Sequence, residues 1–324
     1  MPVTFTGYLE ELTVFDIIGD IHGHAAALER LLIKLGYEER RDGWQQAGRK
    51  VIFLGDFIDR GPEQLKTIEI ARKMVENDHA LAVMGNHELN AIAWATEDQA
   101  KPGAFLRPRT EKNLRQHKAF LDEIGAGSRA HRSTIDWFKE LPLFLDLDDI
   151  RAVHACWHQE HIATIEPYLD SSGAAHEDAW QALCSAGNDA FDAVEVILKG
   201  MEIALPSGVQ FTYKDGHTRK RTRTHWWLSE QGMTYRDLAM VPADIVEQIP
   251  HELVPHDLHL GYDGYKPLFI GHYWMSGKPR LINQHIACVD WSIAASDNPK
   301  AKLCAYQWDG EEELSAKKMR WVDR

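Results

Sequence analysis

The sequence predicts an α/β fold in which parallel strands alternate with helices, and three observations lead to this expectation. Apolar, β-prone runs occur at residues 13–18, 51–54 and 80–84. A stretch of helical character follows each run, and each run ends in a short polar string. Because open α/β sheets place ligand sites at the carboxyl ends of their strands, the strings are expected to meet at one site. The strings are Gly19-Asp20-Ile21-His22-Gly23, Gly55-Asp56-Phe57-Ile58-Asp59-Arg60-Gly61 and Gly85-Asn86-His87-Glu88.

Two connecting helices are expected at residues 25–35 and 64–74. The first has an apolar face at helical spacing, and Gly36 is suited to end it, because glycine adopts the left-handed conformation of a helix C-cap. The second follows Pro62, and proline is favourable at a helix start. Strand, helix and strand in this order form βαβ units, which predict parallel strands.

The rest of the chain is expected to complete this core and to carry two insertions. Residues 97–141 are polar and helical, with breaks at Pro102 and Pro108, and we interpret them as an insertion beside the site. A short strand at 150–153 ends at His154. Residues 160–265 are the least regular part, and core strands resume at 267–270, 286–289 and 302–308. We therefore expect a single domain over residues 1–324 with insertions at about 97–141 and 160–265.

The amino-acid composition limits the partners and the cellular compartment that we expect for the protein. The chain has 324 residues, 44% of them apolar, and a formal net charge of -13, which argues against coating nucleic acid or an anionic membrane. Its four cysteines lack CxxC spacing, and no basic region followed by an apolar signal core begins the chain. No apolar run approaches the roughly 18 residues that span a bilayer. We expect a soluble protein of the reducing cytoplasm.

The polar residues at the strand ends match the ligand chemistry of divalent metals. Asp20 and His22 alternate along an extended segment, so both can point toward one ion. Asp56 directly follows a strand, where its two oxygens can bridge two metals about 3.5–4 Å apart, although a helix amino cap would be the better explanation for a lone Gly-Asp. Asn86 adds an amide oxygen, and His154 and His272 add imidazoles at the ends of apolar runs. Together they favour a dinuclear site over separate structural roles.

The three strings resemble the signature motifs of the phosphoprotein phosphatase superfamily of calcineurin-like metallophosphoesterases, which includes bacterial diadenosine tetraphosphate hydrolases. The resemblance is specific over residues 16–90 and looser around His154 and His272. It implies the calcineurin-like fold, with two central mixed β-sheets flanked by helices in four αββα layers, and with insertions. The sequence departs from the family pattern at Ala155-Cys156-Trp157, where family members usually have small residues. A bulky Trp157 would narrow the mouth of the site.

The resemblance also implies a role for each residue of the strings. One metal would be held by Asp20, His22 and Asp56, and the other by Asp56, Asn86, His154 and His272. His87 would be the general acid, oriented by Asp59, and Arg60 would bind the phosphate. An ion pair with Asp56 or Asp59 is the structural alternative for Arg60.

Two divalent metals suit phosphoester hydrolysis because they lower the pKa of a bridging water toward about 7 and neutralise phosphate oxygens. We expect direct in-line attack by a metal-bridging hydroxide without a phosphoenzyme. Mn²⁺ is the first expectation, and Fe, Zn and Co also suit this ligand set.

A basic segment at residues 214–223 interrupts the acidic chain. Alternating threonine and arginine predict an extended hairpin arm with Arg219, Arg221 and Arg223 on one face. This arm is either a substrate clamp, one arginine of which supplies a second phosphate ligand, or a solvated hairpin that balances nearby acids. Tyr273, beside His272, is a further candidate for the phosphate.

Three functions follow from these expectations. The first is a protein phosphatase-like phosphomonoesterase, and the alternative is a dinucleoside polyphosphate hydrolase, for which the basic arm would hold the phosphate chain. The third is a metal-bound interaction protein without turnover, which the intact set of acid, arginine and ligands disfavours. The expected partner is a phosphorylated protein or a small phosphoester or nucleotide, without membrane or nucleic acid.

Overall fold

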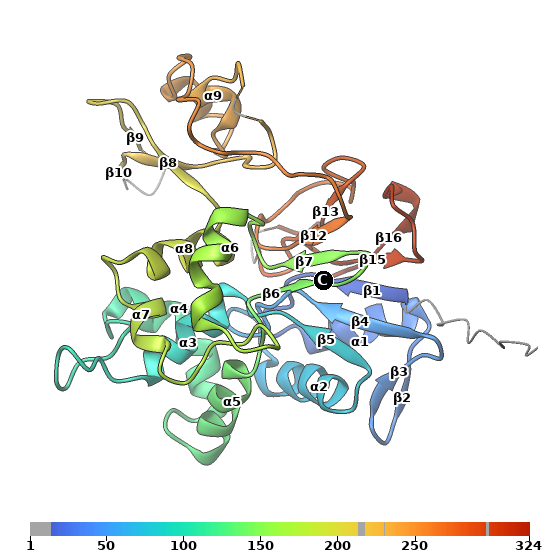
Figure 1. Cartoon of the computed structure of the whole chain (residues 1–324). Helices are drawn as coiled ribbons and strands as arrows, with labels where there is room; N and C mark the ends of the chain where they lie inside the picture. The colour runs from blue at the N-terminus through green and yellow to red at the C-terminus, as the bar shows by residue number, and fades with distance from the viewer. Residues whose placement is uncertain (1–13, 213–217, 230, 296–297) are drawn as a thin grey trace, which may run out of the picture.

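The centre of the molecule is formed by two β-sheets, seen in the computed structural model in Figure 1. The structure describes residues 14–212, 218–229, 231–295 and 298–324. The first sheet has the order β14-β15-β1-β4-β5, with β16 paired to β15. Strands β1, β4 and β5 run parallel, whereas β15 pairs antiparallel to β1. The bounds are β1 Val14–Ile18, β4 Arg49–Phe53, β5 Ala80–Ala82, β14 Asp290–Trp291, β15 Lys302–Trp308 and β16 Met319–Asp323.

The second sheet has the order β13-β12-β7-β6. Its strands β7, β12 and β13 are parallel, and β6 is antiparallel to β7. Both sheets are therefore mixed. The bounds are β6 Phe144–Asp146, β7 Arg151–Val153, β12 Leu268–Ile270 and β13 Ile286–Cys288.

Apolar side chains that alternate between the two faces of each strand explain why the two sheets pack face to face. Phe15 and Ile17 of β1 belong to the same buried cluster as Phe269 of β12, which places this cluster between the sheets. The alternate residue Ile18 belongs instead to the larger core that includes the helices. Successive side chains of a strand point to opposite faces of the sheet. A strand whose side chains are apolar on both faces is therefore buried on both faces, by the other sheet on one side and by helices on the other. The expected arrangement of two mixed sheets between helices is confirmed.

The helices pack outside the sheets. Helices α1 and α2 contact the first sheet, and α6 and α8 pack against each other. Ile197 of α8 accepts backbone hydrogen bonds from Ala155 and Cys156, directly after β7. The bounds are α1 Ala25–Leu35, α2 Gln64–Glu76, α3 Asn86–Ala95, α4 Glu111–Ile124, α5 Arg129–Lys139, α6 Gln159–Ile165, η1 Glu166–Tyr168, α7 Trp180–Cys184, α8 Asp189–Lys199, α9 Tyr235–Leu238, η2 Val246–Gln248 and η3 Ala316–Lys318.

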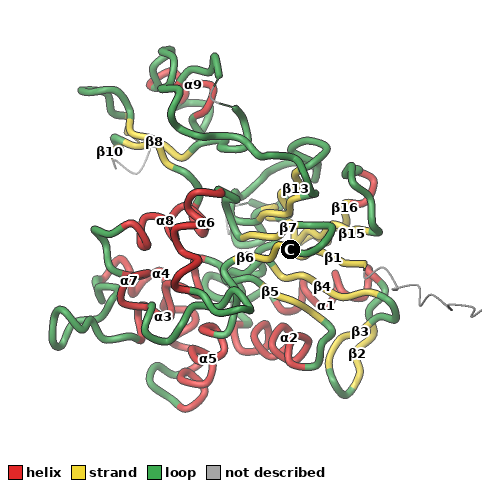
Figure 2. The backbone as a smooth tube through the Cα atoms, in the orientation of Figure 1, coloured by secondary structure: helices red, strands yellow, loops and turns green. Residues whose placement is uncertain are grey.

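The segment that contains α9 has a small apolar core of its own, which includes Phe211 and Leu238. Figure 2 shows that this segment, at the top of the view, is mostly loop with short strand pairs. Within the described residues, 97–141 and 160–265 contribute no strand to either central sheet. The description as one domain with two insertions stays a prediction. Two short strand pairs lie near this segment, β8 Glu202–Ala204 with β11 Arg221–Arg223, and β9 Phe211–Thr212 with β10 Thr218–Arg219. A third pair, β2 Glu38–Arg40 with β3 Gly43–Gln45, lies between α1 and β4 in the chain.

The basic segment differs from the expected single arm. Residues 214–217 lie outside the described residues, and the remainder divides between two strand pairs. Arg219 lies in β10, opposite Phe211, whereas Arg221 and Arg223 lie in β11, opposite Ala204 and Glu202. Only Arg221 and Arg223 are two apart on one strand, so only these two share a strand face.

No helix in the described part of the chain is both long and apolar enough to cross a membrane.

Candidate metal centre

The polar strings meet at the carboxyl ends of five strands. Asp20 and His22 follow β1, Asp56 follows β4, and Asn86 follows β5. From the second sheet, His154 follows β7 and His272 follows β12. Most of these side chains are buried, and His272 is partly buried. The two sheets therefore bring together residues separated by up to 252 positions in the chain, such as Asp20 and His272.

The backbone at this site is strained. Non-glycine residues seldom adopt positive φ, and such strain concentrates at functional sites. Gly85 and Gly271 are required there for a different reason, because a Cβ at Gly85 would lie 2.3 Å from a carboxylate oxygen of Asp56, and a Cβ at Gly271 would lie 2.3 Å from one of Asp20. The site residues with positive φ are His22 (48°), Asp56 (50°), Asp59 (69°), Arg60 (72°), His272 (69°) and Trp274 (48°).

Two groups of potential ligands share the carboxylate of Asp56. One consists of His22, Asp56 and His87, and the other of Asp56, His154 and His272, each with its ligand atoms within 4.8 Å of one another. The Nε2 atoms of His22 and His154 both lie 3.5 Å from Oδ2 of Asp56. Ligands bound at about 2.0–2.2 Å to one cation are roughly 3–3.6 Å apart, so this spacing suits metal coordination.

The histidines are oriented with free lone pairs toward Asp56. Nδ1–H of His22 donates to the carbonyl of Ile58 at 2.9 Å, and Nδ1–H of His154 donates to that of Leu54 at 2.6 Å. These bonds fix the tautomer that leaves Nε2 available. Nε2 of His22 is buried and has no hydrogen-bond partner among the described residues, as expected for an atom whose partner is a cation.

Burial also keeps these imidazoles neutral, which metal binding requires. Desolvation lowers the pKa of His22 to about 3, although the charge of Asp56 opposes this shift. Burial likewise lowers the pKa of His154 and, together with the positive charge of Arg223, that of His272. A neutral imidazole carries a lone pair that a divalent ion can use.

Asn86 and Asp20 lie next to these two groups. The Asn86 Oδ1 and the His272 Nδ1 each lie 3.2 Å from Nε2 of His154, so the three atoms face a common point. The Asp20 carboxylate lies 4.0 Å from Nε2 of His22 and accepts the backbone N–H of His272. Burial and the charges of Asp290 and Asp56 raise the pKa of Asp20. Such a cluster of buried carboxylates needs positive charge, and divalent metals fit this need.

His87 is held by Asp59, and Asp59 is held in turn by a second histidine. Nδ1 of His87 lies 2.5 Å from Oδ2 of Asp59, and Nδ1 of His117 lies 2.9 Å from Oδ1. Burial would raise the pKa of Asp59, but these two hydrogen bonds hold it below its usual range. Burial would lower the pKa of His87, but the charge of Asp56 and the bond to Asp59 raise it. His87 therefore favours its protonated form, which suits a proton donor better than a metal ligand.

Two further carboxylates accept hydrogen bonds from backbone N–H groups and fix the loops of the site. Glu88 accepts the backbone N–H groups of Asp56, Phe57 and Gly85, and therefore fixes the loop that presents the shared ligand. Asp290 accepts the N–H groups of Trp274 and Ser292. It thus positions the turn after His272 through its backbone.

The candidate phosphate-binding residues have different surroundings. The Arg60 guanidinium lies over the Trp274 ring at 4.7 Å, and that ring is edge-on to His22. Arg223 is partly buried, and its positive charge lowers the pKa values of His272 and His154. Arg219 and Arg221 are exposed, and Arg221 lies 3.9 Å from the carboxylate of Glu202.

Tyr273 is buried, and its hydroxyl accepts the indole N–H of Trp226 at 2.7 Å. The Tyr273 hydroxyl is therefore hydrogen-bonded within the protein core, next to His272. Its assignment to the phosphate stays a prediction.

His117 and Trp274 are the site residues that sequence reasoning missed. His117 comes from α4, inside the segment expected to be an insertion, and no motif surrounds it. Its role could have been found only from the packing of this helix over Asp59. That packing is a tertiary contact, which the local sequence does not reveal. Trp274 lies two residues after His272, so its position in the chain offered a weak signal.

We expect Asp56→Asn to lose bound metal at both positions, because one carboxylate serves both ligand groups. The amide keeps the shape of the side chain and can still accept the backbone N–H of His87. Elemental analysis of the purified variant measures this, with Asp98→Asn as the control for a buried carboxylate outside the site. Two retained equivalents of metal would contradict the shared role of Asp56.

Comparison with known proteins places these observations in a family. The calcineurin-like phosphoesterase family matches residues 13–219. An asymmetrical bis(5'-nucleosyl)-tetraphosphatase PrpE from Geobacillus sp. (strain WCH70) is 45% identical over 180 residues, which cover 50% of this chain and 68% of the relative. Its counterpart from Oceanobacillus iheyensis is 30% identical over 143 residues, 43% of this chain and 54% of the relative.

A symmetrical bis(5'-nucleosyl)-tetraphosphatase from Shewanella baltica (strain OS223) is 29% identical over 174 residues, 52% of this chain and 54% of the relative. The chain thus spans about half the length of two of these three relatives. The cold-active protein-tyrosine phosphatase of a psychrophilic Shewanella species shares the fold, with a TM-score of 0.50, 14% identity, and coverage of 93% of this chain and 80% of that one. Because the family match extends over more than half of its residues, the chain belongs to the calcineurin-like metallophosphoesterases.

Proposed function

We propose that the protein hydrolyses dinucleoside polyphosphates at a dinuclear metal centre. The observation that carries this proposal is the pair of ligand groups that share Asp56, beside the His87–Asp59 pair. The sequence alone favoured a protein phosphatase. The names of the relatives favour the alternative, since both relatives from Geobacillus and Oceanobacillus are called bis(5'-nucleosyl)-tetraphosphatases. Such a substrate is a small, extended anion.

The metal-holding residues would be those that the strings supply. Asp20, His22 and Asp56 would bind one ion, and Asp56, Asn86, His154 and His272 the other. When bound, two divalent ions lower the pKa of water and neutralise phosphate oxygens. The mixture of carboxylate, amide and imidazole ligands suits Mn²⁺ and also accepts Fe, Zn or Co, so availability decides which metal is bound.

His87 would donate a proton to the leaving oxygen. Its pKa is raised by the charge of Asp56 and by the bond to Asp59, and that hydrogen bond fixes the ring so that Nε2 faces the ligand groups. Asp59 stays ionised because His117 and His87 lower its pKa. The acid is therefore held in one orientation before the substrate arrives.

Arg60 and Arg223 would bind the phosphate under attack. Arg60 lies on the side of His22, through its contact with Trp274, whereas Arg223 acts on His272 and His154 at the other ligand group. A guanidinium matches two phosphate oxygens with its planar fork. Together, the two guanidiniums would orient the phosphorus for in-line attack, which needs no phosphoenzyme.

We expect His87→Asn to retain both metals and to lower kcat by about 10²–10⁴, the range of general acid–base catalysis. The loss should be smaller on p-nitrophenyl phosphate than on an alkyl phosphate, because p-nitrophenol leaves without protonation. Steady-state kinetics on both esters measure this. Equal losses on both would argue against proton donation by His87.

We expect His117→Gln to lower kcat about tenfold or more without loss of metal, since partners that orient a functional group typically contribute this much. His117 acts through Asp59, so the loss should again be larger on the alkyl phosphate than on p-nitrophenyl phosphate, with little change in KM. His131→Gln is the matched control, because His131 is also a buried helical histidine but does not contact Asp59. Identical kinetics in the two variants would make His117 a packing residue.

The proposed substrate is tested by product analysis of the purified protein with Mn²⁺. Incubation with diadenosine tetraphosphate should yield ATP and AMP, as an asymmetrical cleavage requires, or two ADP if cleavage is symmetrical. The Asp56→Asn variant controls for a contaminating hydrolase. Turnover of a phosphopeptide without turnover of diadenosine tetraphosphate would overturn the proposal and restore the protein phosphatase.

A further inference from the structure

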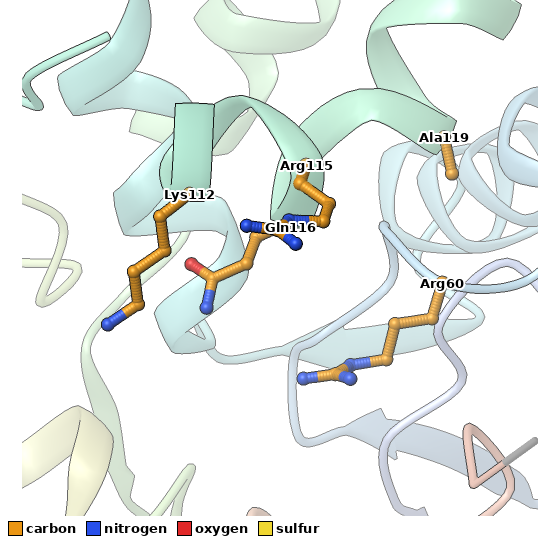
Figure 3. A pocket seen from close by; sticks show the side chains of 5 residues that line it. All are labelled: Arg60, Lys112, Arg115, Gln116 and Ala119. Carbon is orange, nitrogen blue, oxygen red and sulfur yellow. The ribbon is translucent and has the colours of Figure 1, made fainter. Parts of the chain in front are cut away.

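A cavity of about 690 Å³ lies between Arg60 and the first turns of α4. Its described lining consists of Arg60, Lys112, Arg115, Gln116 and Ala119, and contains three cations and no carboxylate. Figure 3 shows the Arg60 side chain extending toward the space into which Lys112 and Gln116 project from α4. The volume lies in the roughly 300–1,000 Å³ range of small-molecule sites, well above the size of one phosphate.

We propose that this cavity is a subsite for the part of a polyphosphate chain that extends beyond the phosphate under attack. The inference rests on the proposed function, because it names where that substrate would place its remaining phosphates. It concerns residues of α4, which lie outside the polar strings of the metal centre.

The spacing on α4 brings the lining side chains to one face. Lys112, Arg115, Gln116 and Ala119 occupy positions i, i+3, i+4 and i+7, which form a single stripe along a helix. The small side chain of Ala119 leaves room at the end of that stripe. His117, on a neighbouring face, is buried against Asp59, so the helix is held in register with the site.

The three cations of this cavity are exposed side chains, and what sets them apart is the lack of a carboxylate partner. Within the described residues, neither Lys112, Arg115 nor Arg60 forms an ion pair with a carboxylate, whereas Lys118 on the same helix pairs with Asp122. Three unpaired cations at one cavity repel each other, and an anion between them removes that repulsion. In a chain with a net charge of -13, such convergence favours an anionic ligand.

Gln116 adds a directed donor to the cavity. The Arg107 guanidinium donates to its Oε1 at 2.8 Å, which leaves the NH₂ group of the amide free to donate to a ligand oxygen.

Arg60 joins the cavity to the metal centre. It follows Asp59 directly, and its guanidinium is held over Trp274, whose ring is edge-on to His22. One phosphate bound near the metals would therefore contact Arg60 from one side, and the next phosphates would reach Lys112 and Arg115 on the other. A single phosphoester ends before that point and gains little from α4.

The test compares the double variant Lys112→Gln/Arg115→Gln with wild type in the Mn²⁺-loaded enzyme. Inorganic tripolyphosphate and orthophosphate are used as inhibitors of p-nitrophenyl phosphate hydrolysis. We expect the inhibition constant of tripolyphosphate to rise about tenfold, through the loss of two charge-assisted contacts, with a much smaller change for orthophosphate. Chelation of the added metal affects both proteins equally. The KM for diadenosine tetraphosphate should rise in parallel.

The matched control is Lys66→Gln/Lys118→Gln, which removes two exposed charges that are already paired with Glu29 and Asp122. Its inhibition constants should equal those of wild type. A tripolyphosphate constant unchanged in the Lys112/Arg115 variant would overturn the subsite. An equal rise for orthophosphate, or in the control, would also overturn it, because the charges would then act on the metal-side phosphate or through the general field.

Failure of the proposed function gives a different pattern. If wild type cleaves no diadenosine tetraphosphate, the proposed substrate is wrong, yet the comparison of tripolyphosphate with orthophosphate still tests the cavity. A KM that rises for a phosphopeptide while the tripolyphosphate constant stays unchanged would assign these residues to a protein substrate and contradict the inference.

Discussion

The structure depends on the burial of several carboxylates at one point between the ends of two sheets. Asp20, Asp56 and Asp290 are all buried there, and burial raises the pKa of Asp20 and brings that of Asp290 to about 6. Buried negative charges are costly unless positive charge or hydrogen bonds compensate them. The neutral histidines around Asp56 supply little of that charge themselves. Their free lone pairs face Asp56, and in the proposed metal centre the bound cations would supply that charge.

The packed strands and the hydrogen bonds at their ends hold these groups together despite backbone strain. The strands are rigid because they are covered on both faces, and the turns that leave them adopt positive φ at His22, Asp56 and His272. Glu88 and Asp290 then fix the turns by accepting backbone N–H groups. The ligand atoms are thereby positioned before any metal binds, which reduces the reorganisation that binding requires.

The sequence alone predicted the features that depend on local pattern. The strand at residues 302–308 and the helix at 25–35 match β15 and α1, since apolar periodicity determines both. The strings predicted which residues meet, because strand ends share one edge of a sheet. The hairpin of β2 and β3 and the strand β16 were missed, since their residues are mostly polar or partly exposed.

Contacts that arise from packing could not be predicted in this way. His117 reaches Asp59 across 58 residues, and α4 presents Lys112 and Arg115 to Arg60, only because α4 packs against α2. The separation of Arg219 from Arg223 likewise follows from the pairing of β10 and β11 with different strands. None of these positions is marked by a motif.

The claim that Asp56 joins two metal positions is tested most directly by anomalous diffraction from crystals grown with Mn²⁺. We expect two anomalous peaks, one on each side of the Asp56 carboxylate and about 3.5–4 Å apart, with His22 beside one and His154 and His272 beside the other. A single peak, or peaks that do not contact Asp56, would contradict it.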